Sequence, residues 1–246
     1  MLIKNKDELT KFLYDFACYL TGFSSKDPAY HYNQFDEKRR YYGCDWPKES
    51  MSMIGVNRML NVQETLFDVI ERDIPGDFIE TGVWRGGACI FAATILKMLD
   101  ITDRRVWVCD SFEGLPKPDP QYQADKDDIH HTIPELAISL ETVQENFKKF
   151  DLVGHNIRFV KGWFCDTLPT IDTDFAVIRL DGDMYGSTID ALTNLYPKLS
   201  AGGYAIIDDY GLIGARLAVN DYRRDNDISA EMIIIDEMSQ SCYWKK

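Results

Sequence analysis

The sequence has no cluster of basic residues and no long apolar run. It holds 27 lysines and arginines against 40 aspartates and glutamates, which gives a net charge of −13 at pH 7. Nucleic acids and anionic membranes are bound mainly through basic clusters, so we expect neither as a partner. No apolar run is long enough to span a bilayer, and Asp7, Glu8 and Asp15 interrupt the N-terminal apolar pattern, so we expect no secretory signal.

Paired cysteines are missing as well. The six cysteines are scattered singly without any C-x-x-C pair, and several lie within apolar runs, as buried reduced thiols do. The sequence also contains no internal repeats and no low-complexity segments. With 246 residues, of which 45% are hydrophobic, the chain can form one sizeable core. We therefore expect a soluble cytoplasmic protein with a single α/β domain and an extension.

The stretch Asp77–Leu99 combines a short apolar run, a glycine turn and a helix. The run ends at Glu80, and the turn reads E-x-G-x-x-x-G-G, with Thr81, Gly82 and Gly86 as candidate ligand contacts. Glycines let a ligand approach the backbone, and the helix start offers free N–H groups, so the pattern favours a nucleotide-like ligand. The spacing differs from the dinucleotide motif and suits S-adenosylmethionine, whose methionine end carries a cation and an amino group. The alternative is an ordinary tight turn between a strand and a helix.

A second apolar strand, Val106–Asp110, also ends in an acid. Asp110 lies about 23 residues beyond Gly87, near the offset of roughly 20 residues at which such a carboxylate meets a ribose diol. The two strands and the helix between them predict a right-handed βαβ unit. Asp110 and the adjacent Ser111 are therefore candidate cofactor contacts, and the alternative for Asp110 is a surface turn.

Two segments outside the regular pattern are candidate lids. Residues 111–134 form a connection of about 24 residues where about 2–6 are usual, so we expect a lid insertion there. The insertion carries His130 and His131, which we interpret as surface histidines and not as catalytic groups. The second candidate lid is an aromatic segment at residues 23–55, ahead of the first strand. We expect an amphipathic helix before it, behind a capping box at Asn5–Glu8, and a second helix after it.

The third strand of the predicted sheet covers residues 157–160 and is followed by Gly162 and Trp163. Both residues leave the strand on the ligand side. Trp163 is therefore a candidate to stack on adenine, and the alternative is an aromatic side chain packed in the core. After the fourth strand we expect Ser187 to cap a helix, and two short strands to close the sheet near the C-terminus.

Acidic doublets follow two successive strands. A strand over residues 175–180 runs into Asp181 and Asp183, and the next strand ends at Asp208 and Asp209. Neighbouring parallel strands end at one sheet edge, so these carboxylates should converge, and we expect no lysine or arginine beside them. Mutual repulsion among them would be relieved by a divalent cation, and ligands made of oxygen alone point to Mg²⁺ or Mn²⁺. The alternative is that each aspartate caps a turn or a helix.

Several motifs together resemble one family, the macrocin O-methyltransferase-like enzymes. These enzymes use a metal and S-adenosylmethionine to methylate sugars on macrolide and aminocoumarin antibiotics. The matching stretches run from about residue 45 to the end of the chain: Asp45–Pro47, Met53–Gly55, GDFIETGVWRGGA, DSFEGLP, RLDGDMYGST, GGYAIIDDYG and Asp221–Arg223. The first 44 residues match no motif, so the resemblance leaves the acceptor undefined.

The resemblance implies a Rossmann-like class I methyltransferase fold: a seven-stranded, mostly parallel sheet with helices on both faces and an N-terminal helical extension. It places the metal on Asp181, Asp208 and Asp209, and the catalytic base on Asp183. We divide the chain into an extension and acceptor lid, residues 1–74, and a methyltransferase domain, residues 75–246. The expected cofactor contacts are Glu80, Thr81, Gly82, Gly86, Asp110, Ser111, Gly162, Trp163 and Asp181.

The expected function is Mg²⁺-dependent transfer of a methyl group from S-adenosylmethionine to a sugar hydroxyl. The acceptor would be a small glycosylated molecule, either a natural product or a surface polysaccharide precursor, and we expect a homodimer or a higher homo-oligomer. Two alternatives remain open at this point. One is a glycosyltransferase that uses Asp181-Gly182-Asp183 as a D-x-D motif, and the other is a module that binds the cofactor without catalysis.

Overall fold

The computed structural model describes residues 6–152, 154 and 156–246. Within these residues the strands form one seven-stranded sheet in the order β3-β2-β1-β4-β5-β7-β6. The strands are β1 (Asp77–Thr81), β2 (Val106–Asp110), β3 (Ile157–Lys161), β4 (Phe175–Leu180), β5 (Leu199–Ile207), β6 (Ile233–Ile234) and β7 (Cys242–Lys245). Neighbouring strands from β1 to β5 pair in parallel, while β7 pairs antiparallel with β5 and β6 with β7. The predicted seven-stranded, mostly parallel sheet is confirmed.

The strand order changes direction at β1, and this change positions the site. The chain moves from β1 to β2 and β3 on one side, and then returns to β4 and β5 on the other side. In such open sheets, ligands bind outside the carboxyl ends of the strands at this switch point. The register there pairs Glu80 of β1 with Arg179 of β4.

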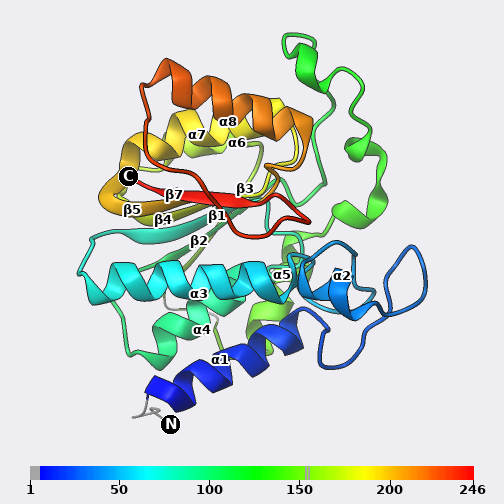
Figure 1. Ribbon diagram of the computed structural model, residues 1–246, viewed down its shortest axis with the longest axis vertical. Helices are drawn as coiled ribbons and strands as arrows, with labels where there is room; N and C mark the ends of the chain where they lie inside the picture. Colours follow the sequence, from blue (N-terminus) through cyan, green and yellow to red (C-terminus); the bar gives the residue numbers. More distant parts are fainter. Residues whose placement is uncertain (1–5, 153, 155) are drawn as a thin grey trace.

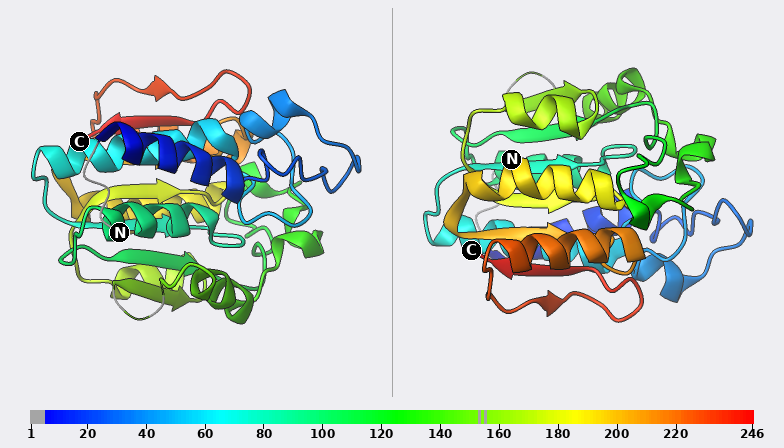
Figure 2. Two further views of the ribbon diagram at one scale, coloured as in Figure 1. Left: turned by 90° about the horizontal axis from the view of Figure 1, so that it is seen from below. Right: turned by 90° about the horizontal axis from the view of Figure 1, so that it is seen from above.

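Helices cover both faces of the sheet (Figure 1). One face carries α1 (Lys6–Leu20), α3 (Gly55–Glu71), α4 (Gly87–Met98) and α5 (Leu140–Lys148). The other carries α6 (Phe164–Thr167), α7 (Tyr185–Leu195) and α8 (Ile213–Asp225). Figure 2 shows α1, α3 and α4 in front of the sheet from below, and α7 and α8 in front of it from above. Each set packs on its own apolar cluster, so the sheet is buried on both faces, as parallel sheets require.

The N-terminal extension packs on the same molecule. Leu9 and Leu13 of α1 are buried in the cluster that also holds residues of α3 and α4, whereas Phe12 is 40% exposed. The predicted amphipathic helix therefore exists, but its apolar stripe is only partly covered. Asn5 of the expected capping box lies outside the described residues. A short helix, α2 (Glu37–Tyr41), lies within the aromatic segment between α1 and α3.

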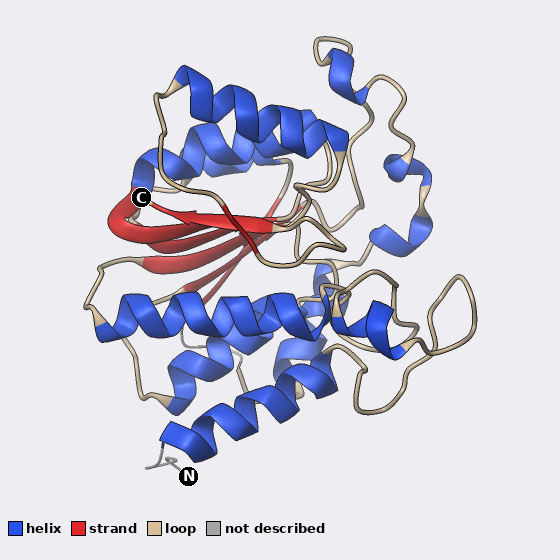
Figure 3. Cartoon of the chain, in the orientation of Figure 1, coloured by secondary structure: helices blue, strands red, loops and turns tan. Residues whose placement is uncertain are grey.

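The connection after β2 contains only short helical turns (Figure 3). In the described part of the chain the 3₁₀ helices are η1 (Gln123–Asp125), η2 (His130–Thr132), η3 (Pro134–Leu136), η4 (Leu168–Thr170) and η5 (Tyr196–Lys198). The first three lie between β2 and α5, at the carboxyl edge of the sheet. Among the described residues, no helix combines the length and the apolar character that crossing a membrane would require.

The start of α7 differs from the prediction. The helix begins at Tyr185, so Ser187 lies inside its first turn and does not act as the N-cap. The carboxylate of Asp125 takes that role, because it accepts hydrogen bonds from the backbone N–H groups of Tyr185 at 2.7 Å and Gly186 at 2.9 Å. The local sequence does not reveal this cap, because Asp125 lies in the insertion far upstream of the helix.

Candidate active site

A pocket of about 560 Å³ opens at the carboxyl ends of the central strands, where the strand order changes direction. Most of the predicted site residues line it: Glu80, Gly82, Asp110, Ser111, Gly162, Trp163, Asp181, Asp183, Asp208 and Asp209. Thr81 and Gly86 are not among the lining residues; Thr81 is fully buried, and Gly86 precedes α4. Their expected cofactor contacts remain predictions.

The glycine turn is built for close contact between β1 and β4. Gly82 has φ +82°, and a Cβ atom there would lie 1.6 Å from the carbonyl oxygen of Asp181. Gly86 has φ +86° and stands at the N-cap of α4 without a side-chain cap. The predicted strand, glycine turn and helix are therefore present, and glycine at position 82 lets the two strand ends meet.

The carboxylate of Asp110 holds this turn against the next segment. Its Oδ2 accepts a hydrogen bond from the Val83 N–H at 2.8 Å, and its Oδ1 accepts one from the Phe112 N–H at 2.7 Å. Burial raises the pKa of the Asp110 carboxyl, and these backbone hydrogen bonds oppose the shift. Because a carboxylate oxygen can accept a second hydrogen bond, Asp110 remains able to meet a ribose hydroxyl.

Trp163 lies at the pocket and not in the core. Its side chain is 37% exposed, and it lines the cavity next to Gly162. Core packing, the alternative left open by the sequence, is therefore excluded. Its expected stacking on adenine remains a prediction.

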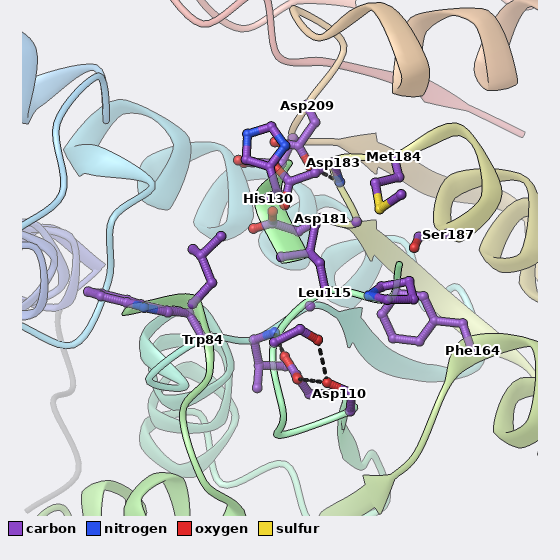
Figure 4. Close-up of a pocket in the computed structure, with 18 of the residues that line it drawn as sticks. Trp84, Asp110, Leu115, His130, Phe164, Asp181, Asp183, Met184, Ser187 and Asp209 are labelled. Carbon is purple, nitrogen blue, oxygen red and sulfur yellow. Dashed lines mark hydrogen bonds between the residues drawn. The ribbon is translucent and has the colours of Figure 1, made fainter. Parts of the chain in front are cut away.

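Three aspartates converge on one point. Ligand oxygens of Asp181, Asp208 and Asp209 all lie within 4.8 Å of one another. Such a set of carboxylate oxygens fits a small hard cation, for which Mg²⁺ or Mn²⁺ is the common choice. Figure 4 shows Asp181, Asp183 and Asp209 gathered at one end of the pocket, with Asp110 at the other end. The predicted convergence of the two acidic doublets is confirmed.

Asp183 differs from the other three in its backbone. It has φ +58°, and its N–H donates a hydrogen bond to Oδ2 of Asp209 at 2.9 Å. Burial, reinforced by the charge of Asp181, raises the pKa of Asp183 to about 7, while His130 acts in the opposite direction. Burial likewise raises the pKa of Asp181 to about 6 and that of Asp209 well above its ordinary range. These shifts reflect carboxylates held together out of water.

The expectation that no lysine or arginine lies beside these acids is wrong. Arg179, whose side chain is 1% exposed, forms ion pairs with Glu80, Asp181 and Asp208. Arg58 forms a further ion pair with Asp208. The sequence contains a signal for Arg179, because residues 179 and 181 point to the same face of an extended strand. The carboxylates at this end of the pocket still outnumber the two guanidinium groups, so the remaining negative charge favours the binding of a cation.

Glu80 is a buried side chain at the wall of the pocket, with both oxygens already engaged. Its Oε1 pairs with Arg179, and its Oε2 accepts a hydrogen bond from the Cys89 thiol at 2.8 Å. Burial raises the pKa of Glu80, and Arg179 opposes that shift. The observed partners of Glu80 thus connect β1 to β4 and α4, and its predicted contact with the cofactor remains a prediction.

Both candidate lid segments contribute walls of the pocket. Gly43, Trp46 and residues 52–54 line it from the N-terminal segment, and residues 114–117 and His130 from the insertion. The N-terminal segment also contacts the residue directly after the insertion, because the Tyr30 hydroxyl donates a hydrogen bond to Glu135. Their closure over an acceptor remains a prediction.

His130 is a pocket residue that the sequence analysis assigned to the surface. Its Nδ1 lies 2.8 Å from Oδ2 of Asp128, and its ring stands next to Asp183 (Figure 4). No local pattern marks it, because the insertion must fold back over the strand ends before the ring meets Asp183.

A doubly wound sheet with a glycine turn after β1 and acids at the ends of β1, β2, β4 and β5 defines a class I methyltransferase. The chain belongs to the macrocin-O-methyltransferase (TylF) family, whose sequence pattern matches residues 5–246. The family resemblance is confirmed, and the protein is an S-adenosylmethionine-dependent O-methyltransferase.

Relatives with described activities support this assignment. The chain is 45% identical over 238 residues to a demethyldecarbamoylnovobiocin O-methyltransferase of Streptomyces niveus, covering 95% of this chain and 88% of the relative. It is 44% identical over 246 residues to a mycinamicin III 3''-O-methyltransferase of Micromonospora griseorubida, covering 98% and 94%. The solved structure of the O-methyltransferase NovP superimposes with a TM-score of 0.92 at 44% identity, covering 96% of this chain and 98% of that structure.

Proposed function

We propose that this enzyme methylates a sugar hydroxyl of a glycosylated natural product and that it requires Mg²⁺ or Mn²⁺. The observation that carries the proposal is the meeting of Asp181, Asp208 and Asp209 in the same pocket as the glycine turn. The names of the two relatives, which act on a novobiocin precursor and on the 3'' position of mycinamicin III, support a natural-product acceptor, and a double-primed position is the usual numbering of an attached sugar. The family assignment disfavours the glycosyltransferase alternative, and the intact aspartate set disfavours a module without catalysis.

In this proposal the glycine turn and the ends of β2 and β3 would hold the cofactor. Gly82 would let the backbone approach the methionine end, Asp110 would receive the ribose diol, and Trp163 would stack on the adenine. The metal is held by Asp181, Asp208 and Asp209. When bound, S-adenosylmethionine supplies an electrophilic methyl group, and the divalent cation lowers the pKa of the acceptor hydroxyl.

Asp183 is the proposed general base. Its carboxylate takes the proton of the acceptor hydroxyl while the acceptor oxygen forms a bond to the methyl carbon. Bound S-adenosylmethionine would supply that methyl group with the carbon–sulfur bonding pair left on sulfur, so S-adenosylhomocysteine would be the second product. Asp183 has a pKa of about 7 without metal, and a divalent cation beside it would lower this pKa, so its carboxyl would be ionised and able to accept a proton near neutral pH. The hydrogen bond from the Asp183 N–H to Asp209 fixes the base relative to the proposed metal site.

An acceptor screen tests the function. The enzyme is incubated with S-adenosylmethionine and three sets of acceptors: macrolide glycosides, aminocoumarin glycosides and nucleotide-sugar precursors of surface polysaccharides. Mass spectrometry should detect the gain of one methylene group on a glycoside in the presence of Mg²⁺, and its loss when a chelator is added. Methylation only of the nucleotide sugars would move the acceptor to the polysaccharide class, and full activity with chelator would refute the metal requirement.

A further inference from the structure

Arg58 connects the proposed metal site to the wall of the pocket. It lies in the first turn of α3, and its side chain is 7% exposed. Its Nη1 pairs with Oδ2 of Asp208, while its Nη2 donates hydrogen bonds to the carbonyls of Gly43 at 2.7 Å and Tyr42 at 3.3 Å. One rigid group thus joins the end of β5 to the segment before α3, across 150 positions of sequence.

The segment is shaped to receive this guanidinium group. Gly43 has φ +65°, and a Cβ atom there would lie 2.2 Å from Nη2 of Arg58 and 2.2 Å from the carbonyl oxygen of Ile54. A larger residue would therefore displace the arginine. We define residues 42–54 as the acceptor wall, because Gly43, Trp46 and residues 52–54 line the pocket.

Two other arginines hold the acceptor wall through partners that lie outside the proposed metal site. Arg40 forms a bidentate pair with Asp45, and Arg85 donates hydrogen bonds to the carbonyls of Pro47 at 3.3 Å and Ser50 at 2.7 Å. These contacts stabilise the wall independently of cation binding at Asp181, Asp208 and Asp209. Arg58 differs because its second partner, Asp208, belongs to the proposed metal site.

We propose that Arg58 is a positioning residue that couples metal binding at Asp208 to the order of the acceptor wall; this inference rests on the proposed metal site. The two oxygens of Asp208 are already paired, with Arg179 on Oδ1 and Arg58 on Oδ2. A divalent cation that binds Asp208 competes with these positive groups and weakens the Arg58 pair. The guanidinium is planar and rigid, so a shift of Nη1 also moves Nη2 and the carbonyls that it holds.

Hydrogen exchange followed by mass spectrometry tests the coupling, with Mn²⁺ as the probe and its binding measured separately by calorimetry. In the wild type, Mn²⁺ should accelerate amide exchange in residues 42–54 about tenfold, the factor expected for the loss of a charge-assisted hydrogen bond. In Arg58→Met, Mn²⁺ should still bind, but exchange in the wall should no longer respond to it.

The matched control is Arg85→Met, which loosens the same wall from the glycine turn and should keep the response to Mn²⁺. Arg58→Lys is the second variant in case Arg58→Met fails to fold; a lysine can keep the pair with Asp208 but cannot hold both carbonyls, so the response should fall by more than half. An unchanged or slower exchange in a wild type that binds Mn²⁺, or a full response in a folded Arg58 variant, overturns the coupling. If the wild type binds no Mn²⁺, the proposed metal site itself fails.

Discussion

Arg179, on β4, donates a hydrogen bond from Nη1 to Oδ2 of Asp181, the residue directly after the strand, at 2.8 Å. The same guanidinium reaches Glu80 on β1 and Asp208 at the end of β5, so one buried cation ties three strands together beneath the pocket. A buried carboxylate that loses its partner is strongly destabilised. Arg179 thus makes this acidic pocket compatible with a folded protein.

The first prediction follows from that arrangement. Arg179→Met should lower the free energy of unfolding by about 3–5 kcal/mol, because it leaves Glu80 and Asp208 with one cation fewer. Urea denaturation measures the change. Arg224→Met, which removes an arginine on the surface, should unfold like the wild type. A loss no larger than that of the control would show that the Arg179 network contributes little to stability.

The second prediction concerns Asp110. Asp110→Ala should weaken S-adenosylmethionine binding about tenfold or more, the effect of losing a charge-assisted hydrogen bond. Asp110 also holds the Val83 N–H, so the loss could arise through the turn instead of the ribose. A cofactor analogue without the ribose 2′-hydroxyl separates the two causes in calorimetry. The wild type should bind the analogue more weakly than the cofactor, whereas Asp110→Ala should bind the two with equal affinity. If the analogue loses the same affinity in both proteins, Asp110 does not contact the ribose.

The parts of this fold that the sequence predicts are those encoded by local pattern. Asp181 and Asp208 follow apolar strands directly, and parallel strands end at one edge, so their meeting is predictable. The contacts of Arg58 with Asp208 and of Asp125 with Tyr185 join residues 150 and 60 positions apart. No periodicity in a single sequence specifies such pairs, because they depend on how loops fold back over the sheet edge. For the same reason the predicted cap at Ser187 is wrong and Arg58 is missed beside the acids. Arg179 is different, because it lies two residues before Asp181 and the strand period places both side chains on one face.

The predicted homo-oligomer needs its own measurement. Phe12 on α1 and Ile213 on α8 are 40% and 72% exposed, so apolar surface remains after the chain has folded. We expect a homodimer or a larger homo-oligomer at micromolar concentration, and light scattering coupled to size exclusion gives the mass directly. A monomeric mass across the concentration range would contradict the expectation.

The raised pKa of Asp183 predicts how stability depends on pH in the absence of metal. The native carboxyl, with a pKa of about 7 against an ordinary value of 3.8, holds a proton that the unfolded chain releases between these values. The contribution of this carboxyl to the free energy of unfolding is therefore largest at low pH and is lost as the pH rises from about 4 to about 7. Asparagine cannot ionise, so in chelator Asp183→Asn should melt several degrees above the wild type at pH 8 and close to it at pH 4. Asp103→Asn, at an exposed position, should match the wild type at both pH values.

The same variant separates the two chemical roles open to Asp183. If Asp183 is the base, Asp183→Asn should lower the rate by about 10²–10⁴-fold, because general-base catalysis contributes that much, while the affinity for Mg²⁺ stays nearly unchanged. The left-handed backbone at Asp183 and its N–H bond to Asp209 favour this role, since they set Asp183 apart from the three converging oxygens.

If Asp183 is instead a fourth metal ligand, the proton leaves to water once the hydroxyl has been acidified. Asp183→Asn should then bind Mg²⁺ more weakly, and a higher Mg²⁺ concentration should recover much of the rate. Titration of activity against Mg²⁺ in both proteins, with the affinity measured independently by calorimetry, distinguishes these outcomes. A base cannot be replaced by more metal, because the missing function is a proton acceptor and not a charge. Recovery of the rate in excess Mg²⁺ would therefore show that the assignment of Asp183 as the base is wrong.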